Sequence, residues 1–306
     1  GQQAINAFTV TTPNNLQDTA FVSTGPNLNF NFTNLDSLTL SYRYRDFYAE
    51  LTPSDYQSDV FSAVLARRLS ALHTLSFNIE TENLTYDDPL IAADFDSLQY
   101  TIALTGSSAS NQYGVEFGVI DVEFETGIRG DNNVYQFFFN RNMNSFNSFS
   151  IRLSETVDNG ARAVTGTIPG VVTTGLFVNN SALFSYAYNS GGLQVDFNST
   201  YSDQDFVAQN TSDRKDLSNS IGFIYGTSLN LQTRLSYTNL KRDFIGTGLV
   251  NNEDLITLSL EKQIFRNFNI AATYINFTRE STINGVSDPD VEENRIIFTL
   301  RYSGRI

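Results

Sequence analysis

Acid–base and nucleophilic chemistry has few candidate residues in this chain, which contains one histidine and no cysteine. The absence of cysteine excludes disulfides, cysteine-based zinc sites, iron–sulfur clusters and covalent haem attachment. The histidine, His73, lies in a predicted short turn between Leu72 and Thr74. A serine hydrolase needs a histidine beside a serine and a carboxylate. A single histidine in a turn is more often a surface residue, and we interpret His73 in that way.

Carboxylates are more numerous and offer a second kind of chemistry. Glu80 and Glu82 lie two residues apart, Glu116 stands in a later segment, and Glu123 and Glu125 follow it. Two carboxylates can act as acid and base in a glycosidase, but the sequence does not fix their separation. Acidic segments can also hold calcium or magnesium, yet no twelve-residue calcium loop is present. We therefore predict no enzyme, no cofactor and no specific metal site.

Arginines recur among the same kinds of polar neighbours as these glutamates. We expect a set of charged residues to line one shared polar surface: Arg43, Arg45, Glu80, Glu82, Glu116, Arg152, Arg234, Arg295 and Arg301. In a pore, facing rows of opposite charge would create a transverse field and set an ion preference. Alternatively, cross-strand ion pairs and arginine–asparagine hydrogen bonds would stiffen or plug the fold. The residue types leave both alternatives open.

Alternation of apolar and polar residues with a period of two recurs along almost the whole chain. The segments 38–45, 75–80 and 296–302 are examples. Such alternation gives a β-strand one apolar and one polar face, and the charged set falls on the polar face. Two segments depart from it. Segment 56–70 has an ambiguous phase, and segment 112–126 shifts phase near Asp121, which indicates a β-bulge.

Short and long connections also alternate along the chain. Short turns fall near 33–37, 70–74, 107–111, 141–147, 189–192, 226–229 and 261–267, and mostly longer, acidic or Gly/Pro-bearing loops lie between them. This pattern is typical of outer-membrane barrels, with the short turns in the periplasm. Fifteen strands are clear, the first near 19–33, and Ile5–Thr12 can supply one more to give an even number. We predict a single domain over residues 1–306, an all-β transmembrane antiparallel up-and-down β-barrel of about sixteen strands, with fourteen or eighteen as alternatives.

Three features favour a membrane barrel over a soluble β-sandwich. The strands span roughly 10 to 15 residues, whereas globular strands usually have about 5 or 6. No helical segment interrupts them, and their polar face is very hydrophilic. Tyrosines also gather at the ends of the apolar face, as expected for an interfacial girdle in a chain without tryptophan: Tyr42, Tyr44, Tyr186, Tyr188, Tyr225, Tyr237 and Tyr302.

Three segments, Leu40–Asp46, Leu235–Tyr237 and Glu293–Tyr302, resemble the β-barrel porin 2 family. That family includes outer-membrane proteins associated with exosortase and exopolysaccharide gene clusters. The resemblance implies an outer-membrane barrel of transport or export type, and it brings no catalytic residues.

The net charge of −14 disfavours nucleic acid as a partner, because no large basic face is available to neutralise phosphates. We expect the chain to lie in a bacterial outer membrane, among lipid and lipopolysaccharide. One function is a porin-like or export channel that passes small solutes or polysaccharide. The alternative is a non-conducting barrel that anchors a partner or a surface assembly. Homo-oligomers fit this alternative, and in a channel segment 158–175 is the best candidate for a loop that folds inward or caps the mouth.

Overall fold

The computed structural model describes residues 2–3, 16–17, 19–49, 55–87, 94–125, 127, 129–159, 176–206, 213–226, 231–265 and 267–302. No helix in these ranges is long and apolar enough to cross a membrane. The strands are β1 (Gln2–Gln3), β2 (Leu16–Gln17), β3 (Thr19–Thr24), β4 (Asn27–Asn31), β5 (Asp36–Ala49), β6 (Tyr56–Arg68), β7 (His73–Tyr86), β8 (Phe95–Ser107), β9 (Asn111–Phe124), β10 (Arg129–Asn142), β11 (Asn147–Asn159), β12 (Leu176–Ser190), β13 (Leu193–Phe206), β14 (Arg214–Gly226), β15 (Leu231–Phe244), β16 (Leu249–Phe265), β17 (Phe268–Ile283) and β18 (Val286–Tyr302).

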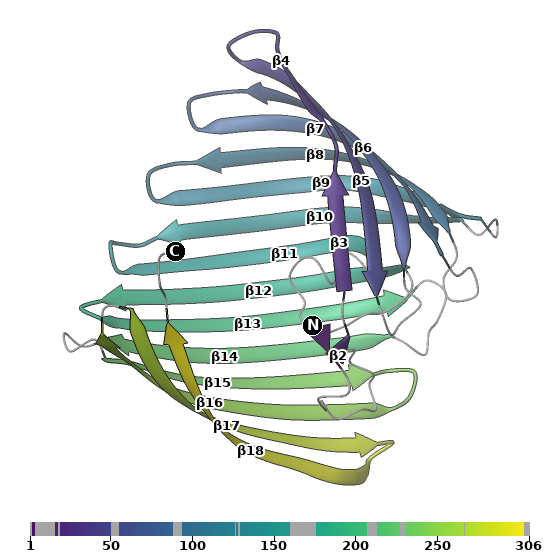
Figure 1. The fold of residues 1–306 in the computed structure, drawn as a ribbon. Coiled ribbons are helices and arrows are strands. Elements are labelled where there is room, and N and C mark those ends of the chain that lie inside the picture. Colours follow the sequence, from purple (N-terminus) through teal and green to yellow (C-terminus); the bar gives the residue numbers. More distant parts are fainter. Residues whose placement is uncertain are drawn as a thin grey trace.

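The strands form one antiparallel meander, in which each strand from β5 to β18 pairs with its neighbours along the chain (Figure 1). β3 and β4 both pair with β5 and complete a 16-stranded sheet, while β1 and β2 form a separate two-stranded sheet. The prediction of an all-β, antiparallel, up-and-down fold is confirmed. The additional strand expected over Ile5–Thr12 lies outside the described residues, as does most of the loop expected at 158–175.

The first long strand is divided at Gly25 and Pro26, where a single strand near 19–33 was expected. Proline has no backbone N–H to donate to a sheet, and Gly25 has a φ of 154°. A Cβ atom at Gly25 would collide with the carbonyl oxygen of Tyr42 on β5. Arg43 fixes the division, because its guanidinium donates hydrogen bonds to the carbonyl oxygens of Gly25 (2.9 Å) and Pro26 (3.1 Å) and to the side chain of Asn27 (2.6 Å).

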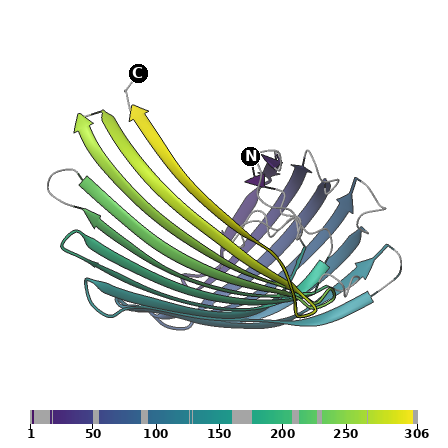
Figure 2. The same cartoon turned by 90° about the horizontal axis from the view of Figure 1, so that it is seen from below.

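The sheet curls into an open trough, with the first and last strands at opposite rims (Figure 2). Within the described residues β18 pairs only with β17, and β3 and β4 pair only with β5. Both rims run in the same direction, because β4 and β18 each end at the short-turn side of the sheet. Closing this sheet by antiparallel pairing therefore requires one further strand of the opposite direction.

The two faces of the sheet differ in chemistry over most of its height. Partners in an antiparallel register share a face, so the pairing rows can be followed from strand to strand. One row joins Phe223, Leu235, Leu258, Tyr274 and Ile296, and these side chains are exposed. The opposite face carries mainly Ser, Thr, Asn and charged residues and contains nearly all the buried side chains. The polar face is therefore the concave one, and the apolar face is convex.

This polarity is reversed near the long-loop ends of β5 to β9. There the concave face carries buried apolar residues, the inner apolar cluster: Phe47, Tyr56, Leu84, Tyr86, Phe95, Ile120, Val122 and Phe124. The convex face at this level carries exposed carboxylates such as Asp96, Asp121 and Glu123.

The reversal explains both segments with an irregular hydrophobic pattern. The bulge expected near Asp121 is wrong, because β9 keeps an unbroken register with β8 and β10 through this position. Side-chain polarity changes face there while the backbone continues regularly. In β6, buried Tyr56 and Val60 lie on the concave face and exposed Phe61 and Leu65 on the convex face, so neither phase dominates in the sequence. Register irregularities do occur at Gln263/Phe265 and Arg279/Ser281.

Candidate functional site

The convex apolar band is the first of two surfaces that define how this sheet could act. In β16 the convex positions Ile256, Leu258 and Leu260 are bounded by Asp254 on the loop side and Lys262 on the turn side. An apolar belt with polar borders on the outside of a β-sheet matches the lipid-facing zone of a membrane barrel. The register places all seven predicted girdle tyrosines on this face.

Tyrosine hydroxyls mark the border of the band on the loop side. Tyr237 donates to Asp254 (2.6 Å), Tyr274 to Asn294 (2.7 Å) and Tyr201 to Asp203 (3.2 Å). Tyr42 donates in the same way to Asp59. In each case the acceptor lies two pairing rows closer to the long loops than the tyrosine, in the next row of the same face. The rings therefore pack in the apolar band while their polar ends point out of it, as expected at a membrane interface.

On the turn side the hydroxyl of Tyr186 points in the opposite direction, and that of Tyr113 reaches sideways within its own pairing row. Tyr186 donates to Asn147, which lies two pairing rows closer to the short turns. Tyr113 lies across Gly106, where a Cβ atom would come within 2.7 Å of its Oη, and its hydroxyl bonds to Nε2 of His73 (2.7 Å). The Nδ1 atom of His73 bonds to Ser70 (2.9 Å). His73 therefore begins β7 and anchors a tyrosine on the convex face.

Loss of a girdle hydroxyl is expected to cost a modest amount of stability. The substitution Tyr237→Phe removes the hydrogen bond to Asp254 while keeping the ring, so the free energy of unfolding should fall by about 1 kcal/mol. Urea unfolding in lipid vesicles measures this change. In a double-mutant cycle with Asp254→Ala, the two losses should not add, and full additivity would contradict the coupling.

The concave wall is the second surface, and the register places all nine predicted charged residues on it. Some of them are engaged in the sheet itself. Arg43 holds the division between β3 and β4, and Arg45 pairs with the buried Glu82 at 3.3 Å. Arg295 pairs with Glu293, and Arg234 donates to Gln232 (2.8 Å).

Other members of the set face the concave space without an ion pair. Among the described residues, neither Glu116 nor Arg152 forms a salt bridge, and Arg152 is exposed. Arg301 also lies on this wall, and Glu80 lies there as well, although its side chain or backbone is engaged in an interaction. The wall therefore combines both alternatives derived from the sequence, ion pairs that stiffen it and charges that project from it. The prediction that these residues line a lumen stays a prediction.

The sequence analysis missed a group of concave charges at the long-loop ends of β14 to β16. Arg214 pairs with Asp216 (2.9 Å), and Arg242 pairs with Glu253 (3.3 Å). The guanidinium of Arg214 also lies 6.0 Å from the centre of the Phe244 ring. Alternation from the neighbouring serines of β14 could have placed Asp216 on this face.

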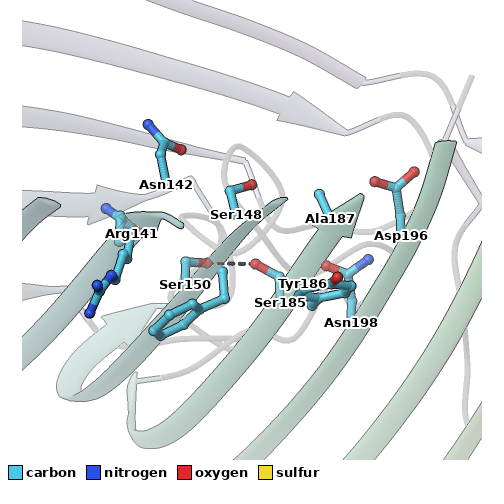
Figure 3. A pocket seen from close by; sticks show the side chains of 11 residues that line it. Arg141, Asn142, Ser148, Ser150, Ser185, Tyr186, Ala187, Asp196 and Asn198 are labelled. Carbon is cyan, nitrogen blue, oxygen red and sulfur yellow. Dashed lines mark hydrogen bonds between the residues drawn. The ribbon is translucent and has the colours of Figure 1, made fainter. Parts of the chain in front are cut away.

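A pocket of about 370 Å³ lies on the concave wall near the short turns. Ser150 and Ser185 form a hydrogen bond across neighbouring strands, and Asn198 and Asp196 stand on the next strand (Figure 3). The lining is rich in hydroxyl and amide groups, which both donate and accept hydrogen bonds. No group of three or more metal-binding side chains occurs in the described part of the chain.

Comparison with known proteins yields structural likeness only. No protein-family model and no curated protein matches this chain. The copper transporter OprC aligns with 93% of this chain at 11% identity and a TM-score of 0.50, and this chain spans 56% of it. OmpT, an outer membrane protein of Vibrio cholerae, aligns with 94% of this chain and 97% of its own at 10% identity and a TM-score of 0.41.

An anion-selective porin from Comamonas acidovorans aligns with 93% of this chain and 99% of its own, at 9% identity and a TM-score of 0.40. At these identities the likeness concerns the fold. The chain therefore shares with them the fold of an antiparallel, up-and-down β-sheet.

Proposed function

We propose that this chain forms a porin-like channel in a bacterial outer membrane. The observation that carries the proposal is the two-sided sheet. Its convex side is an apolar band bounded by tyrosines, and its concave side is a wall of hydroxyl, amide and charged groups. Such a sheet shields its polar face from lipid only by enclosing it, and a barrel of about sixteen strands is wide enough to hold water. Small solutes or polysaccharide would pass along this wall.

Single-channel recording in planar lipid bilayers tests the channel. The folded protein should give discrete current steps that scale with salt concentration. The absence of current above background at any voltage, measured on folded protein, would contradict the proposal. The circular dichroism spectrum of the same sample provides the control for folding.

The second candidate function is a non-conducting barrel that anchors a partner or a surface assembly. The inner apolar cluster favours it, because buried apolar side chains occupy the concave face at the long-loop ends where a channel would open. Its test is co-purification of a stoichiometric partner from the envelope, together with the absence of current.

The proposal of an outer-membrane protein also includes its orientation, with the short turns in the periplasm. It further includes contacts with lipopolysaccharide, homo-oligomers and a role in exopolysaccharide export.

Reversal of a projecting charge should change the ion preference of the channel. The substitution Arg152→Glu places a carboxylate on the concave wall and is expected to raise the cation-to-anion permeability ratio by roughly twofold. Reversal potentials in a salt gradient measure this ratio. Arg141→Glu is the matched control, because Arg141 lies on the convex face, three pairing rows closer to the short turns. Equal shifts in the two variants would contradict the assignment of the faces.

A further inference from the structure

Two half-buried aromatic rings, Phe138 in β10 and Phe277 in β17, lie on the concave wall away from its long-loop ends, and within the described residues only Phe138 of the two packs over a glycine. Most concave aromatic residues, such as Phe47 and Phe95, are buried at the long-loop ends. Phe138 instead lies in the middle of the wall, in β10, where it pairs with Gly114 on one side and Arg152 on the other. It is only half-buried, so part of the ring is accessible from the concave space.

The ring of Phe138 lies over Gly114 of the neighbouring strand. A Cβ atom at Gly114 would collide with Cε1 of the ring and come within 2.8 Å of Cζ. Only glycine leaves room for the ring at this position. Phe138 is therefore held against the backbone of β9, as a platform on the wall rather than a side chain that projects from it.

Polar side chains of several kinds surround this platform. The register puts Gln136 and Asn140 on either side of Phe138 along β10, with Glu116 on β9 and Arg152 on β11. Diagonal neighbours in a sheet are about 7–8 Å apart, within reach of long side chains. The surroundings offer amide, carboxylate and guanidinium groups, and the two charges cancel.

The polar surroundings continue toward the short turns. The next row on the concave face contains Asn140, Ser150, Ser185 and Asn198. These four residues line the pocket in Figure 3. The platform and the pocket therefore form one continuous surface, with an apolar ring at one end and hydroxyl and amide groups along the rest.

We propose that Phe138 is the stacking platform of an oligosaccharide-binding subsite on the concave wall. A pyranose has an apolar C–H face that can cover an aromatic ring and a rim of hydroxyls that both donate and accept hydrogen bonds. Amide and hydroxyl side chains match that rim, and their extension over several strands suits a chain of sugars. The balance of Glu116 and Arg152 gives no advantage to a charged solute. The inference rests on the proposed channel only for access to the wall.

The experiment measures interruption of single-channel current by maltohexaose, a neutral linear sugar. The wild type should show interruptions that saturate with sugar concentration. Phe138→Ala should weaken binding by roughly tenfold. Gly114→Val should weaken it to a similar extent, because it displaces the ring without removing it, and Phe138→Tyr should retain binding. Phe277→Ala, which removes another concave aromatic ring from β17, is the control and should leave binding unchanged.

The outcomes separate the subsite from the channel. Equal sugar binding in the wild type, Phe138→Ala and Gly114→Val would overturn the proposal, as would interruption by a zwitterionic amino acid but not by maltohexaose. Where no current flows, the channel fails, and saturation-transfer NMR of maltohexaose with detergent-solubilised protein still decides the subsite. Phe138→Leu replaces Phe138→Ala if circular dichroism shows that the alanine variant does not fold.

Discussion

The substitution Leu258→Arg is expected to lower the free energy of unfolding in lipid vesicles by about 2–4 kcal/mol. Leu258 lies at the centre of the convex band in β16, between Ile256 and Leu260, and its row neighbours are Leu235 and the ring of Tyr274. An arginine there would place its guanidinium in hydrocarbon, where no water or anionic group compensates the lost hydration. The chain would recover part of this cost by extending the side chain toward the interface.

The neighbouring residue supplies the control for this measurement. Thr257 lies on the concave wall, where its row partners are Ser236 and Ile275. Thr257→Arg should change the free energy of unfolding by less than about 1 kcal/mol, because the guanidinium stays in water. Urea titration of both variants in vesicles gives the comparison. A larger loss for Thr257→Arg than for Leu258→Arg would mean that the two faces have been assigned the wrong way round.

The substitution Phe47→Ala should cost about 3–5 kcal/mol through an ordinary packing defect. Phe47 is 1% exposed and stacks on Tyr56, with 5.3 Å between the ring centres. Its removal would leave a cavity in the inner apolar cluster, which lies on the polar side of the sheet. Stability in the same urea assay measures the loss.

Tyr48→Ala is the matched control for Phe47→Ala, because Tyr48 is the next residue and is 52% exposed on the convex side. Its loss should stay well below that of Phe47. If Tyr48→Ala proved the more costly variant, the convex face would hold the packed core at this level, and the reversal of polarity would be refuted.

Sequence alone could predict most of the architecture, because the alternation of apolar and polar residues is repeated many times along each long strand. The assignment of Leu38, Leu40 and Tyr42 to one face and Arg43 to the other needs no coordinates. The division of the first strand was less visible. Gly25 and Pro26 give a local signal, but the guanidinium that satisfies their carbonyl groups comes from a residue 17 or 18 positions away.

The reversal of polarity could not be derived from alternation, because the pattern identifies two faces without saying which face is buried at each height. A change from apolar-out to apolar-in looks the same as the insertion of one residue, and a bulge near Asp121 was the natural interpretation. Only the pairing of Asp121 with Leu98 and Asp131 shows that the backbone is regular. Likewise, Arg242 and Glu253 become partners through the register of β15 with β16.

Assembly of the protein must move the acidic loop ends across the bilayer when the short turns stay in the periplasm. Asp96, Asp121, Glu123 and Asp131 stand on the lipid-facing side of their strands, so they meet hydrocarbon in transit although they end in water. Insertion scales assign roughly 2.5–3.5 kcal/mol to an aspartate at the centre of a membrane helix. These carboxylates therefore raise the kinetic barrier to insertion without changing the stability of the inserted state.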